Sequence, residues 1–184
     1  LKQLKSRLVN YSNDFSGTEA TYLAKTRHQL LSTDYLKTVD VTCKISIIIP
    51  YFNTDESIMR VLDSLNSQWI TTKSYENVQV IVIDDGSDEA KSVSTIKFPD
   101  YKFEVKLVRH DTNNGRSAAR NTGFYYSSGD IIIFLDSDCI PHPSFVGEHW
   151  IRNHICENSL FIGLKHDVIV LNDISDDKTP FYEY

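Results

Sequence analysis

The sequence has few cysteines and no arrangement of them that would build a metal knuckle or a disulfide framework. Cys43, Cys139 and Cys156 are widely spaced, odd in number and outside any Cys-x-x-Cys pair. This favours a reducing compartment. The longest apolar runs, Ile45–Ile49 and Ile131–Leu135, are too short to span a bilayer, and the N-terminus lacks a signal-peptide layout. We therefore expect a cytoplasmic protein, with peripheral attachment to a membrane as the alternative.

Positive charge is also scarce. The chain carries 19 Lys and Arg against 25 Asp and Glu, so its net charge is −6, and its isoelectric point is near 5.5. This balance argues against a protein that follows a nucleic-acid backbone by bulk electrostatics. An anionic substrate would need a positioned arginine or a bound metal ion. With 41% hydrophobic and 24% charged residues, the composition is that of an ordinary globular domain.

The patterning divides the chain into two parts. In residues 1–42, leucines such as Leu1, Leu4 and Leu8 recur at roughly helical spacing among polar residues. We expect a helical N-terminal extension that packs on the main domain; a linker or oligomerisation arm is the alternative. Residues 43–184 form the second part. Because the chain begins with Leu1 rather than Met, we expect a fragment of a longer protein.

From residue 43 onward the pattern alternates between strands and helices. Short β-branched or apolar runs predict strands at Ile45–Ile49, Val78–Ile83, Phe103–Val108 and Ile131–Leu135. Helices are predicted after Asn53, which would form a capping box with Glu56, in a stretch after Ser87, which would cap it, and from about Arg116 to Tyr126. Leu160–Leu171 predicts a further strand. This alternation indicates an α/β fold with a mainly parallel sheet flanked by helices.

Polar clusters follow three of the predicted strands: Tyr51–Asn53, Asp84–Asp88 and Asp136–Asp138. Open α/β sheets bind ligands beyond the carboxyl ends of their strands, so these clusters predict a site at that edge. Asp136 and Asp138 lie two residues apart, and in an extended segment both carboxylates would point the same way. Hard oxygen ligands of this kind suit Mg²⁺ or Mn²⁺, which also takes phosphate oxygens. The alternative is a solvated turn that caps the next helix.

Two other clusters could contact a nucleotide. Asp84 and Asp85 are adjacent carboxylates that need partners, and either could accept hydrogen bonds from a base or a ribose. Asn114 and Gly115 indicate a tight loop before a helix. Arg116 and Arg120 lie four residues apart and could face a base or a pyrophosphate together. The alternative for Arg116 is a surface ion pair. His142 is near enough in sequence to reach the same site, while Pro141 and Pro143 are better explained as fixing the turn into the next helix.

In order and spacing, these motifs resemble those of the family 2 glycosyltransferases of the GT-A fold: Ile47–Asn53, Asp84–Ser87, Asn114–Gly123 and Asp136–Asp138. The resemblance covers about residues 43–155 and implies an inverting, metal-dependent transferase that uses a nucleotide-diphospho-sugar, commonly a UDP-sugar. It implies Asp136 and Asp138 as ligands of Mn²⁺ or Mg²⁺. It implies the following donor-binding residues: Pro50, Tyr51, Asn53, Asp84, Asp85, Asn114, Gly115, Arg116, Arg120, Asp136 and Ser137.

Such enzymes use a general base to deprotonate the acceptor hydroxyl. No acidic residue after Asp138 lies in a motif of that kind, so we expect the base beyond Tyr184 and a domain that is truncated on its acceptor side. The expected partners are the donor and a carbohydrate, lipid-linked or other hydroxyl acceptor, as in polysaccharide biosynthesis. A non-catalytic nucleotide-sugar-binding or scaffolding domain remains an alternative. A sugar nucleotidyltransferase fits less well, because Tyr51–Glu56 contains no Gly or Lys.

Overall fold

The structure of the protein is a computed structural model, which describes residues 40–54, 57–155, 160–163 and 165. The predicted N-terminal extension falls almost wholly outside these residues. The strands are β1 (Ile45–Tyr51), β2 (Val78–Asp84), β3 (Glu104–Arg109) and β4 (Ile131–Phe134). The α-helices are α4 (Ser57–Leu65), α5 (Arg116–Tyr126) and α6 (Phe145–Ile155), and the 3₁₀ turns are η1 (Thr72–Asn77), η2 (Glu89–Lys91) and η3 (Val93–Thr95). The predicted alternation of strands with helices is confirmed.

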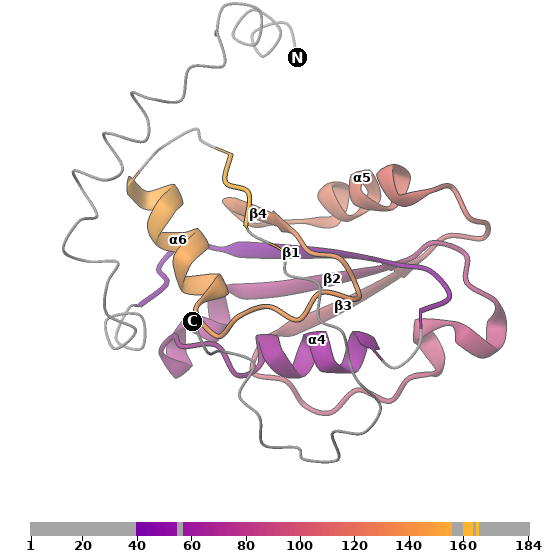
Figure 1. The fold of residues 1–184 in the computed structure, drawn as a ribbon, viewed down its shortest axis with the longest axis horizontal. Coiled ribbons are helices and arrows are strands. Elements are labelled where there is room, and N and C mark those ends of the chain that lie inside the picture. The colour runs from indigo at the N-terminus through magenta and orange to yellow at the C-terminus, as the bar shows by residue number, and fades with distance from the viewer. Residues whose placement is uncertain (1–39, 55–56, 156–159, 164, 166–184) are drawn as a thin grey trace, which may run out of the picture.

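All four strands are parallel, in the order β3-β2-β1-β4. The chain moves from β1 through β2 to β3 in one direction and then returns to add β4 on the other side of β1 (Figure 1). The segments after β1 and β4 therefore diverge at the carboxyl edge of the sheet. In open α/β sheets this reversal of strand order is where a ligand binds.

The two central strands, β1 and β2, are almost continuously apolar and are buried on both faces. Side chains alternate between the faces: Ile47 and Ile49 pack with the buried residues of α4 and with Val146 of α6. Ile48 points the other way and packs with Ala119 of α5. Figure 1 shows α4 and α5 on opposite sides of the sheet. The α/β architecture with a parallel sheet flanked by helices is thus confirmed.

Helix α5 lies very close to β1. A Cβ added at Gly123 would lie 2.2 Å from Cγ2 of Ile48, so only glycine permits this approach. Pro50 is accommodated within β1 because the ladder to β4 ends at the Ile48–Phe134 pair. The carbonyl of Ile48 accepts the N–H of Leu135 at 3.0 Å, so Ile48 faces β4, and Pro50, two residues later, faces the same way. An N–H at Pro50 would therefore lie beyond the end of the ladder to β4, where no hydrogen bond is lost.

Several local predictions were wrong. Asn53 does not cap α4, which begins at Ser57; its Oδ1 accepts the backbone N–H of Asp88 instead, at 2.9 Å, and its own φ is 47°. Glu56 lies outside the described residues. Ser87 does not cap a helix either, because its Oγ accepts the backbone N–H of Asn53 at 2.9 Å. Only the 3₁₀ turns η2 and η3 follow it before β3.

The strand predicted at Leu160–Leu171 is absent from residues 160–163 and 165, and its other residues lie outside the described part of the chain. Across the ranges that the structure describes, no helix combines the length and the apolar composition that a membrane span requires.

Candidate functional site

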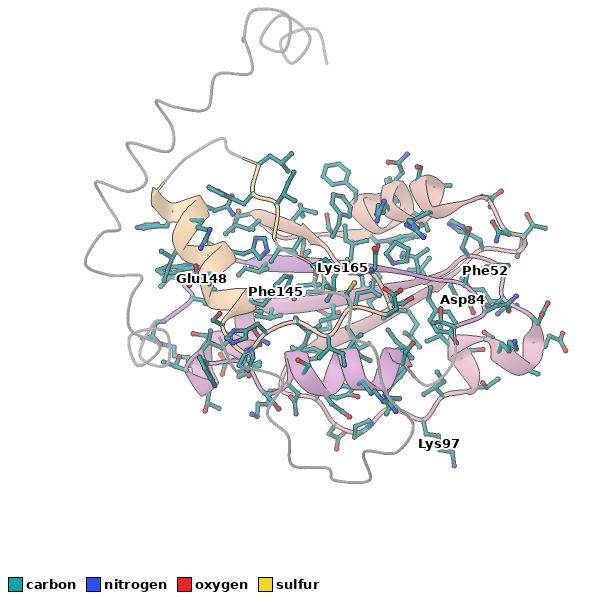
Figure 2. The ribbon with its side chains drawn as sticks, viewed as in Figure 1. Phe52, Asp84, Lys97, Phe145, Glu148 and Lys165 are labelled. Atoms are coloured by element: carbon teal, nitrogen blue, oxygen red, sulfur yellow. The ribbon has the colours of Figure 1, made fainter. Side chains whose placement is uncertain are left out.

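A cavity of about 430 Å³ opens at the carboxyl edge of the sheet, between the segments that follow β1 and β4. Its position coincides with the reversal of strand order. It is lined by Pro50, Tyr51, Phe52, Thr54, Asp85, Asn113, Gly115, Arg116, Ala119, Asp136, Ser137, Asp138 and Lys165. Phe52 and Asp84 mark this end of the sheet, whereas Glu148 of α6 lies toward the other end (Figure 2). The segments that follow β1, β2 and β4 thus meet at one place, as the sequence predicted, and the loop before α5 and Lys165 join them there.

The segment after β1 is held in place by a buried tyrosine. Tyr51 is 2% exposed, and its hydroxyl lies 2.8 Å from the carbonyl oxygen of Lys91 and in contact with that of Thr54. Thr54 in turn approaches Ser137, with 3.3 Å between their hydroxyl oxygens. The β1 segment is therefore linked to η2 on one side and to the acidic turn after β4 on the other.

The adjacent carboxylates after β2 have different environments. Asp84 is fully buried and does not line the cavity. Its Oδ1 accepts the N–H of Ser87 at 2.9 Å, and its Oδ2 accepts hydrogen bonds from the hydroxyl of Ser92 at 2.6 Å and from Arg109 Nη1 at 2.8 Å. The N–H of Val93 also donates to Oδ2, at 3.2 Å.

Burial alone would raise the pKa of Asp84. The hydrogen bonds from Ser87 and Ser92 and the charge of Arg109 outweigh that effect, so the pKa lies below its ordinary value. Asp84 is therefore an ionised anchor inside the protein, and the structure does not bring it to the cavity with the other predicted site residues.

Asp85 does reach the cavity, although it is only 3% exposed. Its Oδ1 lies 2.6 Å from Nδ1 of His110 and accepts the N–H of Asn114 at 3.0 Å. Its Oδ2 accepts the N–H of Gly115 at 2.8 Å. Each of the two adjacent carboxylates therefore has its own partner: Asp84 contacts Arg109, and Asp85 contacts His110.

The loop that follows β3 depends on two glycines. Gly86 has φ 73°, and a Cβ there would lie 2.4 Å from the carbonyl carbon of Thr112. This close approach brings the loop against Asp85. Gly115 has φ 89° and directly precedes α5, so the first backbone N–H groups of α5 and the exposed side chain of Arg116 lie beside the cavity. A helix N-terminus of this kind favours an anion.

Arg120 does not line the cavity with Arg116. Its Nη2 donates to Oδ1 of Asp136 at 2.8 Å, and each side chain of this pair is 34% exposed. Arg120 also has a buried Nε for which the described residues offer no acceptor. It thus positions one of the two candidate metal ligands. Asn53 and Asn114 contribute through the loop hydrogen bonds already given, and neither lines the cavity.

The acidic turn after β4 brings the two predicted metal ligands together. Asp136 and Asp138 lie in a turn rather than an extended segment, closed by a hydrogen bond from the N–H of Cys139 to the carbonyl of Asp136 at 3.1 Å. One carboxylate oxygen of each aspartate and Sγ of Cys139 lie within 4.8 Å of one another. The predicted convergence is present, although the predicted extended geometry was wrong.

The chemistry of this cluster suits a hard divalent cation. Burial, and then the neighbouring Asp138, raise the pKa of the Cys139 thiol, so the two carboxylates are the available anionic ligands. The Nζ of Lys165 lies 3.8 Å from Oδ1 of Asp138. Its contact with Cys139, followed by the charge of Asp138, raises the pKa of Lys165. A cation of the protein therefore already lies beside these carboxylates.

Sequence reasoning missed several contributors. Phe52 and Ala119 lie inside the predicted motifs but were not among the predicted donor-binding residues. Thr54 and Asn113 directly adjoin those motifs, so extending each motif by one position would have included them. Lys165 and His110 lack such a signal, because they reach the site only through the fold. His142 does not line the cavity; it contacts the ring of Trp69, with 5.4 Å between centroids, and its Nδ1 lies 2.8 Å from the hydroxyl of Ser144.

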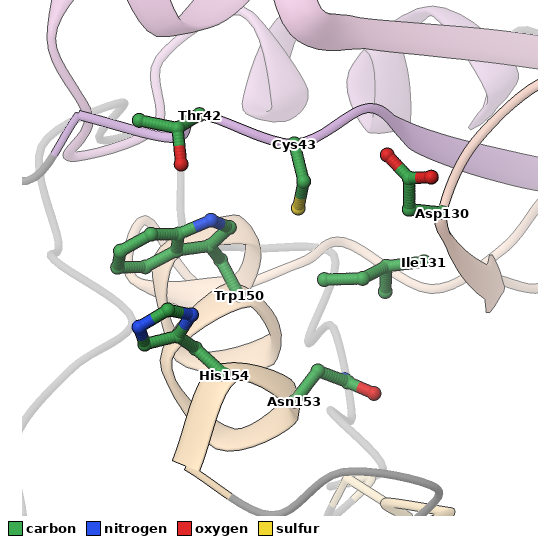
Figure 3. Close-up of a pocket in the computed structure, with 7 residues that line it drawn as sticks. All are labelled: Thr42, Cys43, Asp130, Ile131, Trp150, Asn153 and His154. Carbon is green, nitrogen blue, oxygen red and sulfur yellow. The ribbon is translucent and has the colours of Figure 1, made fainter.

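A second cavity, of about 360 Å³, lies at the amino ends of β1 and β4. Its lining residues are Thr42, Cys43, Asp130, Ile131, Trp150, Asn153 and His154 (Figure 3). Trp150 and His154 stack, with ring centroids 5.3 Å apart. This cavity lies at the opposite edge of the sheet from the carboxylates and contributes nothing to their site.

Comparison with known proteins agrees with this geometry. The family model described as glycosyl transferase family 2 matches residues 46–152. Glycosyltransferase AglE of Haloferax volcanii is 36% identical over 102 residues, which are 55% of this chain and 33% of AglE. The Escherichia coli UDP-Glc:alpha-D-GlcNAc-diphosphoundecaprenol beta-1,3-glucosyltransferase WfgD is 32% identical over 124 residues, which are 67% of this chain and 42% of WfgD. The chain thus spans less than half the length of these relatives.

The crystal structure of residues 1–349 of TarS from S. aureus has the same fold over 57% of this chain and 30% of its own, with a TM-score of 0.50 and 25% identity. This likeness confirms the GT-A architecture that the motifs implied. The family model covers more than half of the chain, and its segment contains every residue described above at the cavity except Lys165. The chain belongs to glycosyl transferase family 2.

Proposed function

We propose that this chain is the donor-binding part of a metal-dependent glycosyltransferase that transfers a sugar from a UDP-sugar to an acceptor hydroxyl with inversion. The observation that carries the proposal is the meeting of Asp85, Asp136 and Asp138 in one cavity at the reversal of strand order. The E. coli relative is named as a transferase of glucose from UDP-Glc to a diphosphoundecaprenol-linked sugar. That name supports a UDP-sugar donor and a lipid-linked acceptor for this protein.

In the proposed arrangement, the nucleoside lies between the segment after β1 and the loop before α5, against Pro50 and Asp85. Arg116 and the N-terminus of α5 lie beside the same cavity and would attract the negatively charged diphosphate. Asp136 and Asp138 would hold Mn²⁺ or Mg²⁺ through their carboxylate oxygens, with Arg120 fixing the orientation of Asp136. A bound divalent ion would neutralise the charge that develops on the leaving diphosphate.

Lys165 and Asp138 form a weak, exposed contact in the described structure. We propose that Lys165 exchanges this carboxylate for a phosphate oxygen when donor and metal occupy the site, because Lys165 and the metal ion would compete for the carboxylate of Asp138. Each carboxylate that lines the cavity in the described part of the chain then has a role in donor binding. We therefore expect the general base for the acceptor hydroxyl to come from outside these residues.

The substitution Asp138→Asn tests the metal role, with Asp100→Asn as a matched control. Asp100 is exposed and precedes β3, at the amino edge of the sheet away from the cavity. Calorimetric titration with UDP should show binding to wild type that is stronger with Mn²⁺ than without it, by on the order of tenfold or more. Asp138→Asn should lose this dependence, and Asp100→Asn should keep it. An unchanged Mn²⁺ dependence in Asp138→Asn would refute the proposed metal site.

Donor hydrolysis or transfer by the full protein separates catalysis from binding alone. A transferase releases UDP from a UDP-sugar at a rate that depends on Asp138, whereas a scaffolding domain binds the donor and leaves it intact. Release of UDP by wild type and its loss in Asp138→Asn would support the enzyme. Tight binding with no release in the presence of lipid-linked saccharide acceptors would favour the scaffold.

A further inference from the structure

His110 bridges two elements beside the cavity without lining it. It directly follows β3, and its two ring nitrogens have different partners: Nδ1 lies 2.6 Å from Oδ1 of Asp85, and Nε2 lies 2.8 Å from the hydroxyl of Thr122 on α5. The His110 side chain is 14% exposed and that of Asp85 is 4% exposed. The backbone N–H of His110 also donates to the carbonyl of Asp84, at 2.8 Å. Both the ring and the backbone of this residue are therefore fixed.

These contacts determine which nitrogen carries the hydrogen. An ionised carboxylate only accepts, so Nδ1 must donate to Asp85. In the neutral ring, Nε2 then accepts a hydrogen bond from the hydroxyl of Thr122. In the charged ring, Nε2 would donate to the oxygen of the same hydroxyl instead. His110 thus links the Asp85 carboxylate to Thr122 of α5 through two hydrogen bonds, so the position of α5 determines the orientation of the carboxylate.

The hydrogen bonds of Asp85 leave a defined acceptor position. A carboxylate has about four lone-pair sites, and Oδ1 uses two of them, for His110 and the N–H of Asn114. Among the described residues Oδ2 has one partner, the N–H of Gly115. One acceptor position therefore remains on Oδ2 of Asp85, and Asp85 lines the cavity.

We propose that His110, together with Thr122, is a positioning residue that orients this last acceptor of Asp85 toward the nucleobase and so makes the site selective for uracil over cytosine. Uracil presents a hydrogen on N3, which the carboxylate can accept. Cytosine presents a lone pair at the same position, which repels the carboxylate and leaves it unpaired. This inference rests on the proposed function, because it assumes that a nucleotide occupies the cavity.

The substitution His110→Ala removes the donor to Oδ1 and the link to Thr122, and lets the carboxylate turn away from the base. His110→Asn is the conservative variant, because an Asn side-chain N–H can reproduce the Nδ1–H donor. Thr122→Val keeps the shape of Thr122 and removes only the hydroxyl that fixes the ring. It tests the same link through a variant with little effect on packing, should His110→Ala fail to fold.

The test measures the affinities of UDP and CDP by calorimetric titration in the presence of Mn²⁺, on the full protein and its variants. Wild type should prefer UDP by on the order of tenfold or more, the usual effect of one hydrogen bond to a charged group. His110→Ala should reduce UDP affinity by a similar factor with little change for CDP, so that the preference disappears. His110→Asn should retain most of the preference for UDP over CDP, and Thr122→Val should reduce this preference.

The failures of the two proposals have different signatures. Equal loss of UDP and CDP affinity in His110→Ala, or an unchanged preference in both His110→Ala and Thr122→Val, overturns the role of His110. A wild type that binds UDP and CDP equally well also overturns it, while leaving the nucleotide site intact. A wild type that binds neither nucleotide overturns the proposed function itself.

Discussion

Replacing Asp84 by Asn tests whether the first of the two adjacent carboxylates stabilises the fold or binds a ligand. The amide keeps the size of the side chain and one oxygen, which can still accept the N–H of Ser87. At the other position an NH₂ group replaces Oδ2. It then faces three donors: the hydroxyl of Ser92, the N–H of Val93 and the guanidinium of Arg109.

The expected loss of stability follows from what each donor can do next. The Ser92 hydroxyl can turn to Oγ of Ser94, 2.8 Å away. The Arg109 side chain is 39% exposed and can reach water. The N–H of Val93 cannot reach water in the same way, because Val93 is 2% exposed. One buried unpaired donor costs about 1–3 kcal/mol, and the lost charged acceptor adds about 1 kcal/mol, so we expect a decrease of about 2–4 kcal/mol in unfolding free energy.

Urea unfolding followed by circular dichroism measures this loss, and Asp100→Asn is again the control, with an expected change below about 0.5 kcal/mol. Asp84 does not line the cavity. Where the Asp84→Asn variant is folded, its affinity for UDP in the presence of Mn²⁺ should therefore be within about threefold of the wild-type affinity. A loss below about 1 kcal/mol together with abolished UDP binding would refute this reasoning and make Asp84 a ligand contact.

The remaining predictions concern pH and the loop glycines. Because the folded pKa of Asp84 is below its ordinary value, its stabilisation is complete above about pH 4 and is lost as the pH falls through the folded pKa. The difference in unfolding free energy between wild type and Asp84→Asn should therefore shrink on acidification below about pH 4, and an undiminished difference there would contradict the cause assigned to the shift. Gly86→Ala should destabilise the protein by about 2–4 kcal/mol in thermal or urea unfolding, because strain at φ 73° adds to the 2.4 Å clash with Thr112. Gly115→Ala, where φ is 89° and no atom lies within 4 Å of the added Cβ, should cost about 1 kcal/mol, and an equal cost at both glycines would show that the backbone clash is relieved.

The sequence by itself determined the secondary structure wherever one strong periodic pattern was present. The β-branched runs at Ile45–Ile49 and Val78–Ile83 lie in β1 and β2 because such residues fit a sheet that is buried on both faces. Helix α5 spans Arg116–Tyr126 as predicted. The order of the acidic motifs after these strands also predicted the edge at which they meet, because all parallel strands end their carboxyl termini on the same side.

Only the tertiary structure decided which polar side chains enter the cavity. Asp84 and Asp85 are neighbours of the same type, yet Asp84 is buried against Arg109 and Asp85 lines the site. The loop before α5 donates its Asn114 and Gly115 N–H groups to Asp85, which ties that carboxylate to the cavity. Asn53 has the composition of a helix cap, but the donor that it meets is the N–H of Asp88 from a distant loop. His110 and Lys165 carried no local signal, because their partners are brought near only by strand order and loop packing. Short-range patterns determine which elements form; contacts between distant segments determine what each polar group at their ends can do.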